Sequence, residues 1–223
     1  MAARRPSRQR PLLTSEQEEA IRAAVATAER ETAGEVVPWI VEACDPYPEA
    51  PWKGAAAGAL GVIVVAWAVH FATGGWGGML SRVVLPTMVG TVVGFLLGSL
   101  PAAKRWLAGA EVLEQRVHTA AAAAFLHAQV FATRERTGVL LFVALLEHRV
   151  VVLGDTGISA RVKPGEWQAI ADDVVAAIRR GDVGGGVCAG VGACGRLLAE
   201  RGVTRSPADV NELPDTPRLG DRR

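Results

Sequence analysis

Five residues near predicted strand ends offer the ligand types that could hold a divalent cation. They are two carboxylates, two hydroxyls and a glycine that permits close backbone approach: Asp155, Glu35, Thr32, Thr137 and Gly157. Hard oxygen ligands are what Ca²⁺ and Mg²⁺ bind, so the set predicts a weak Ca²⁺ or Mg²⁺ site, with no firm cofactor. The alternative is that these are turn residues with solvated carboxylates and an ordinary Glu35–Arg136 ion pair.

Other patterns that could do chemistry are better explained by packing, so catalytic residues stay unknown. The glycine-rich stretch 181–195 has no Gly-Lys-Ser/Thr, so close helix packing is favoured over a phosphate loop. Cys188 and Cys194 have no histidine nearby in sequence and are expected to be small buried thiols. His118 and His127 are nine positions apart on one predicted helix, which places them on opposite faces, so they cannot share a metal.

Strands must position the five candidate ligands. Residues 35–43 and 138–146 are apolar runs of strand length, and 149–153 returns antiparallel after a tight turn. Stretches 28–43 and 133–148 share one order of charged residues, Thr, Gly and apolar strand, which predicts two helix–strand units with parallel strands. All five candidates then meet at one edge of the sheet. Pro38 predicts that the first strand lies at an edge or is bulged.

Periodic apolar residues predict four soluble helices. The first begins at a Ser15-x-x-Glu18 capping box and ends before Gly34. A single long helix is expected after the apolar region, and Pro164 opens another. The expected ranges are about 15–32, 104–134, 164–180 and 183–201.

The segment between the two soluble parts is apolar, since Arg82 is the one formal charge in residues 54–103. Two runs, 54–71 and 83–100, approach the roughly 20 residues that a membrane-spanning helix needs. Trp52, Trp76 and Trp106 fall where interfacial tryptophans are expected. We therefore expect a two-helix transmembrane hairpin. The alternative is a pair of helices buried in a globular protein.

Small residues four positions apart are expected to bring the two helices of the hairpin together. Such spacing lines one helix face and permits close backbone approach. The expected packing residues are Gly54, Gly58, Gly90, Gly94 and Gly98.

The chain is therefore expected to consist of one α/β domain interrupted by the hairpin. The expected parts are a disordered basic arm (1–13), the first part of the domain (14–52), the hairpin (53–103), the second part (104–203) and an extended C-terminal tail (204–223). Lys53, Lys104 and Arg105 flank the hairpin, and positive residues concentrate on the cytoplasmic side. Three free cysteines also fit a reducing compartment. We expect the domain to be cytosolic.

Four stretches resemble the TPM domain family, which includes the thylakoid-lumen photosystem-repair proteins and many bacterial membrane proteins. They begin with LTSEQEEAIRAAVATAERETAGEVVPWIVEACDPYPEA and FLHAQVFATRERTGVLLFVALLEHRVVVLGDTGI, followed by WQAIADDVVAAIRRGDVGGGV and DVNELPDTPRL. The match is most similar to the bacterial membrane branch. The resemblance implies an α/β, Rossmann-like sandwich, here interrupted by the hairpin. It also implies either a phosphatase activity with divalent-cation binding or an assembly module.

Together these observations predict an integral protein of a bacterial inner membrane. The expected partners are the lipid bilayer and other membrane proteins. A net charge of +1 argues against nucleic acid. The expected function is a non-enzymatic binding, assembly or accessory module, and the alternative is a metal-dependent phosphatase.

Overall fold

The computed structural model describes residues 11–73, 80–203 and 212–220. The chain forms two compact units. We call residues up to 44 and from 116 onward the α/β unit, and residues 45–115 the hairpin unit. Most of the expected N-terminal arm, and Trp76, lie outside the described residues.

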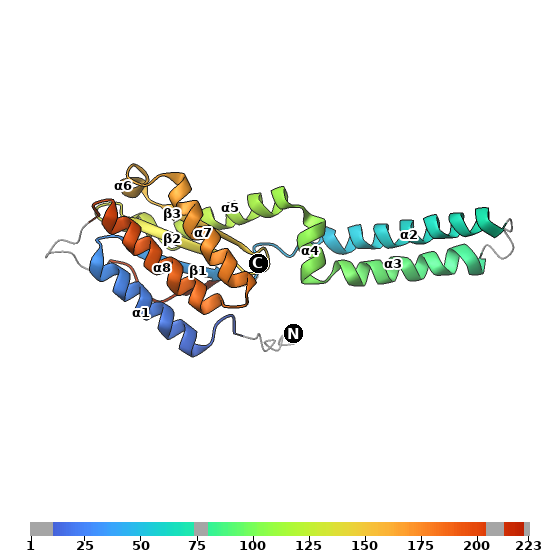
Figure 1. Cartoon of the computed structure of the whole chain (residues 1–223), viewed down its shortest axis with the longest axis horizontal. Coiled ribbons are helices and arrows are strands. Elements are labelled where there is room, and N and C mark those ends of the chain that lie inside the picture. Colours follow the sequence, from blue (N-terminus) through green and yellow to red (C-terminus); the bar gives the residue numbers. More distant parts are fainter. Residues whose placement is uncertain (1–10, 74–79, 204–211, 221–223) are drawn as a thin grey trace, which may run out of the picture. The chain divides into compact units, whose positions relative to one another are not determined.

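The α/β unit is built on a four-stranded sheet with the order β3-β2-β1-β4. Figure 1 labels the first three of these strands. The strands are β1 (Glu35–Val41), β2 (Gly138–Ala144), β3 (Arg149–Gly154) and β4 (Arg218–Gly220). β1 and β2 are parallel, with Glu35 opposite Gly138, and β3 is antiparallel to β2. The predicted pairing of the first three strands is therefore confirmed.

β1 is an internal strand, so the prediction that Pro38 marks an edge or a bulge is wrong. Its neighbours are β2 and β4. The reason Pro38 is tolerated is that β4 pairs with β1 only from Trp39 to Val41. Pro38 precedes that pairing, so its missing N–H removes no bond to β4.

Helices cover both faces of the sheet (Figure 1). One core contains apolar residues of α1 (Ser15–Glu31), α7 (Pro164–Arg179) and α8 (Val183–Glu200). The other contains residues from the second half of α5 (Ala110–His127) and from the short helix η2 (Val130–Ala132). Alternate residues of β2 feed the two cores, as the period of a strand requires.

Two predicted helix boundaries need correction. Thr14, not Ser15, caps α1, and Gln17 completes the capping box. The single helix expected over 104–134 is divided into α4 (Pro101–Ala108), α5 and η2. The break after α4 occurs because Gly109 has a φ of 84°, a left-handed conformation that glycine adopts readily.

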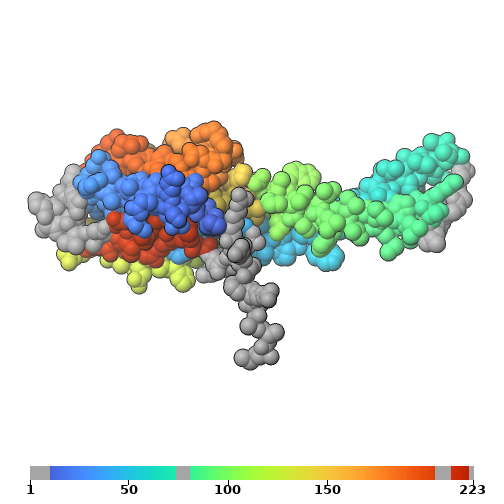
Figure 2. Space-filling view, turned by 90° about the horizontal axis from the view of Figure 1, so that it is seen from below, coloured from blue at the N-terminus to red at the C-terminus, as the bar shows by residue number. Residues whose placement is uncertain are grey.

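The end of the chain belongs to the sheet, although the sequence predicted an extended tail. Residues 218–220 form β4, parallel to β1. In Figure 2 this C-terminal segment (red) lies beside α1 (blue). The segment reads as a tail because it is rich in proline and charge, and because three paired residues are too few to give an alternating pattern.

The hairpin unit consists mainly of α2 (Glu49–Thr73) and α3 (Leu85–Gly98), which pack side by side. A short π-helix, η1 (Leu80–Val84), precedes α3. Both helical segments are long and apolar enough to cross a membrane, and only 6% and 11% of their most apolar windows are buried.

Candidate functional site

The candidate site lies at the edge of the sheet where β1 and β2 begin and β3 ends. The first residue after β3, Asp155, caps the short helix α6 (Thr156–Ser159) by accepting a hydrogen bond from the Thr156 N–H at 2.7 Å. Its own N–H donates to the Gly138 carbonyl at 2.9 Å. Chain geometry therefore fixes Asp155 beside the start of β2.

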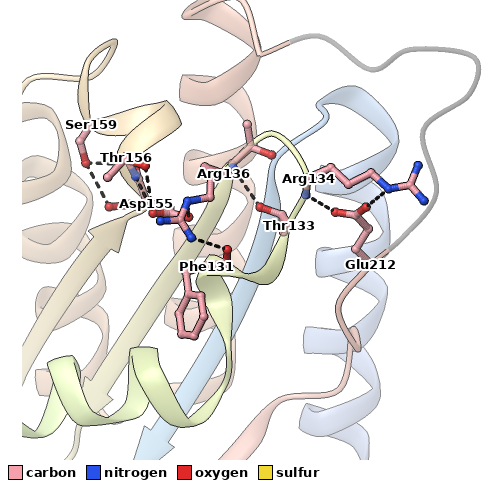
Figure 3. Close-up of polar contacts among 10 residues, drawn as sticks. Phe131, Thr133, Arg134, Arg136, Asp155, Thr156, Ser159 and Glu212 are labelled. Atoms are coloured by element: carbon pink, nitrogen blue, oxygen red, sulfur yellow. Dashed lines mark hydrogen bonds and ion pairs between the residues drawn. The ribbon is translucent and has the colours of Figure 1, made fainter.

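Asp155 is buried and faces Arg136, which occupies the turn before β2 (Figure 3). The Arg136 Nε lies 3.4 Å from Asp155 Oδ2. The same guanidinium donates to the Phe131 carbonyl at 2.9 Å and lies over the Phe131 ring. Because these contacts hold the guanidinium against Asp155, the buried carboxylate has a cationic partner. The sequence had suggested Glu35 as the partner of Arg136.

The other predicted ligands join loops to one another. Thr32 Oγ1 donates to the Val203 carbonyl at 2.6 Å, and Thr137 Oγ1 donates to the Ala33 carbonyl at 3.0 Å. The Gly157 N–H donates to the Arg136 carbonyl at 3.1 Å. A Cβ on Gly157 would lie 2.7 Å from that oxygen, so the close approach requires glycine.

Glu35 contacts the C-terminal segment. Its Oε1 accepts a hydrogen bond from the Glu212 N–H at 3.0 Å. Glu212 in turn receives the Arg134 N–H at 2.9 Å and pairs with the Arg134 side chain at 3.1 Å (Figure 3). These bonds tie the strand starts to the segment that leads into β4.

The structure places Glu35 and Asp155 on opposite sides of Gly138. Both lie opposite this glycine, so two strand spacings, about 10 Å, separate their backbones. The Val130 backbone lies against Gly138 between them. Within the described ranges, no group of three His, Cys, Asp or Glu residues is placed to hold a metal. A divalent cation at Asp155 would have to displace Arg136, which already pairs with that carboxylate. Weak Ca²⁺ or Mg²⁺ binding stays a prediction.

A second acidic group lies on the α1 side of the same edge. Glu29 Oε1 accepts the Val36 N–H at 3.3 Å, and its carboxyl interacts with Glu35 and Asp215. Burial, followed by repulsion from Glu35 and Asp215, raises the pKa of Glu29 to about 8. Glu29 therefore carries a proton at neutral pH, and its carboxyl group can donate a hydrogen bond to Glu35.

Both Cys188 and Cys194 were expected to be buried thiols, but only Cys194 is buried and Cys188 is half-buried. Cys194 is fully buried, and burial raises its pKa to about 12. Burial also raises the pKa of the half-buried Cys188 thiol. Both thiols are therefore protonated at neutral pH and poor nucleophiles.

Sequence reasoning missed part of this edge. The missed residues are Glu29, Arg134, Glu212 and Asp215. A signal was present, because the stretch DVNELPDTPRL contains two of them and belongs to the family resemblance. Because the stretch was predicted to form an extended tail, its acidic residues were not expected at the site.

The comparisons with known proteins agree with this fold. The model of the TPM domain family matches residues 111–197. This chain contains a TPM domain. The family resemblance seen in the sequence is confirmed for these residues, and α1, β1 and β4 of the α/β unit lie outside them.

A solved structure has the same fold as this chain. It is the NMR structure of the BA42 protein from the psychrophilic bacterium Bizionia argentinensis. The two are 20% identical, with a TM-score of 0.57, and the match covers 94% of this chain and 97% of that chain. At this identity the likeness concerns the fold alone. The search of curated proteins found no match.

Proposed function

We propose that this protein is a membrane-anchored TPM module that binds or helps to assemble other membrane proteins, without catalysing a reaction. The observation that carries the proposal is the distribution of apolar side chains on α2 and α3. Large apolar residues are exposed along both helices, with Leu60, Val65 and Leu96 each more than 60% exposed. A continuous apolar surface of this kind requires lipid or protein around it.

The contacts at the candidate site support binding over catalysis. Asp155 pairs with Arg136 and caps α6. Thr32 and Thr137 join loops through hydrogen bonds. Such residues hold the edge in one shape. A sheet edge held in one shape can serve as a binding surface, which suits an accessory module of an inner-membrane complex.

We place the α/β unit on the cytosolic side of a bacterial inner membrane. Support comes from Lys53, Lys104 and Arg105, which flank the hairpin, against Arg82 near its turn. A reporter that is active only in the periplasm, fused after Arg223, should stay silent, whereas the same reporter inserted in 74–79 should be active. Activity after Arg223 contradicts the proposed side.

The test of the assembly role is purification of the full chain from membranes. The chain should resist extraction with alkaline carbonate, and defined membrane proteins should copurify in reproducible proportion. The protein purified alone should show no metal-dependent hydrolysis of a phosphate monoester. A protein that purifies alone and turns over such an ester with Ca²⁺ or Mg²⁺ would reverse the proposal.

A phosphohydrolase is the second candidate, and Glu29 is the observation that favours it. A carboxyl whose pKa is raised to about 8, next to the carboxyl groups of Glu35 and Asp215, is an arrangement that can supply a general acid. Glu29→Gln should abolish any hydrolysis if the candidate is right. The matched Glu31→Gln, on an exposed position of the same helix, should leave it unchanged.

A further inference from the structure

β3 is the outer strand of the described sheet, and one side of its backbone points away from β2. In an antiparallel pair, hydrogen-bonded positions alternate along the strand. The Asp155 N–H donates to Gly138, so the next bonded positions on β3 are Leu153 and Val151. The main-chain groups of Val150, Val152 and Gly154 therefore face outward.

These outward groups open into a slot of about 340 Å³. Residues 150–154 form its floor, and α5 and α7 contribute its walls. The wall residues that matter here are His118, Trp167, Gln168 and Ala171. Ser159 Oγ donates to the Gly154 carbonyl at 3.0 Å, which leaves Val150 and Val152 as the main outward-facing pair.

Val150 and Val152 are only 8% and 9% exposed. In the part of the chain that the structure describes, no hydrogen bond reaches their outward N–H and C=O groups. Main-chain N–H and C=O groups need a hydrogen-bond partner, which here is either water in the slot or another chain. Such a chain must offer both donors and acceptors at a two-residue repeat of about 6.6 Å, which is the repeat of an extended polypeptide.

We propose that this slot binds an extended segment of a partner protein, which adds to β3 as a further strand. Alternate side chains of the segment pack on Trp167 and Ala171, so they are apolar. A second copy of β3 is a poorer occupant, because its own α5 and α7 would meet the same two walls. The proposal rests on the assembly function above and names the kind of partner and the surface it uses.

The test uses the full chain in detergent micelles and a labelled hexapeptide of alternating Val and Thr. The peptide should bind, and amide hydrogen exchange at Val150 and Val152 should slow. N-methylation of alternate peptide nitrogens keeps the side chains but removes main-chain donors. It should weaken binding by about tenfold or more. No binding, or equal binding of the N-methylated peptide, overturns the proposal.

A matched pair of variants locates the site. Gln168 and Ala169 are both exposed on α7, but only Gln168 lines the slot. Gln168→Trp should weaken peptide binding by about tenfold, and Ala169→Trp should leave it unchanged. Equal effects, or a dimer of the full chain that Gln168→Trp dissociates, count against a partner segment. If Gln168→Trp abolishes peptide binding yet keeps all membrane partners, the slot fails as their site and the assembly function stands.

Discussion

Two pairs of helices in this protein, α2–α3 and α1–α8, meet through glycines but place their apolar side chains in opposite ways. In the hairpin, a Cβ on Gly54 or Gly58 would meet the backbone of Gly94 or Gly90. In the α/β unit, a Cβ on Gly195 of α8 would lie 2.7 Å from the Ala28 Cβ of α1. In both pairs glycine permits an approach that any side chain would block.

The difference lies in what surrounds each pair. Ile21 and Val25 of α1 and Leu198 of α8 are fully buried in the core. On α2 and α3 the glycines lie between the helices, and Leu60 and Leu96 are exposed. Glycine at a helix contact therefore does not tell a soluble helix from a membrane helix. The position of the large apolar residues relative to that contact does.

The largest expected effect is in the α/β unit. Gly195→Leu would press on Ala28 in a filled core, and overpacking of this kind costs about 1–3 kcal/mol of unfolding free energy. The matched Gly192→Leu meets only the flexible Arg196 side chain, at 3.4 Å, and should keep or raise stability. Denaturant unfolding of the full chain in detergent measures both. Equal unfolding curves for the two variants would contradict close α1–α8 packing.

The hairpin should respond more weakly. Gly94→Leu would separate α2 from α3, because a Cβ there already meets the Gly54 carbonyl, and each lost interhelical contact is worth on the order of 1 kcal/mol. Gly61→Leu is the control, since no atom lies within 4 Å of its added Cβ. Protease resistance in micelles should fall for the first variant only. Unchanged resistance after Gly94→Leu would contradict close packing of α2 against α3.

Some pairings in the two units could be predicted from the sequence and others could not. The α2–α3 pair was predictable because five glycines in register and a charge-free run are local signals. The parallel β1–β2 pair was predictable because two similar helix–strand segments occur in order. Arg136–Asp155 pairing was not, because it depends on a left-handed turn at Arg136, with a φ of 58°.

The acidic group at Glu29 was also beyond sequence reasoning. Glu29 and Asp215 meet because the chain end returns to the sheet as β4. Nothing local marks a three-residue strand after a proline-rich stretch. Contacts between residues far apart in sequence are fixed by the fold. The sequence therefore predicted where the candidate site lies but not which residues pair with one another there.

The stability of the α/β unit should depend on pH through Glu29. The pKa of Glu29 is raised from 4.5 to about 8 by burial and by its acidic neighbours, so the folded state binds one more proton between these values. Stability therefore falls as pH rises from about 4.5 to about 8, and is level above.

Glu29→Gln should remove this slope and raise the melting temperature at pH 8. The exposed Glu31→Gln should keep the slope. Melting curves of the full chain over this pH range provide the measurement. A slope that persists in Glu29→Gln would assign it to other groups.

The smallest expected effect is cation binding, and it should be confined to the α/β unit. Asp155 and Glu35 are separated by Gly138, and Arg136 competes for Asp155, so Ca²⁺ or Mg²⁺ binding should be weak, on the order of millimolar. Amide NMR of the full chain should show small shifts at residues 154–158 and none in α2 or α3. Asp155→Ala should abolish them, and Asp172→Ala, an exposed carboxylate of α7, should not. Shifts that survive Asp155→Ala would place the cation elsewhere, and a flat titration would leave Asp155 as a structural partner of Arg136.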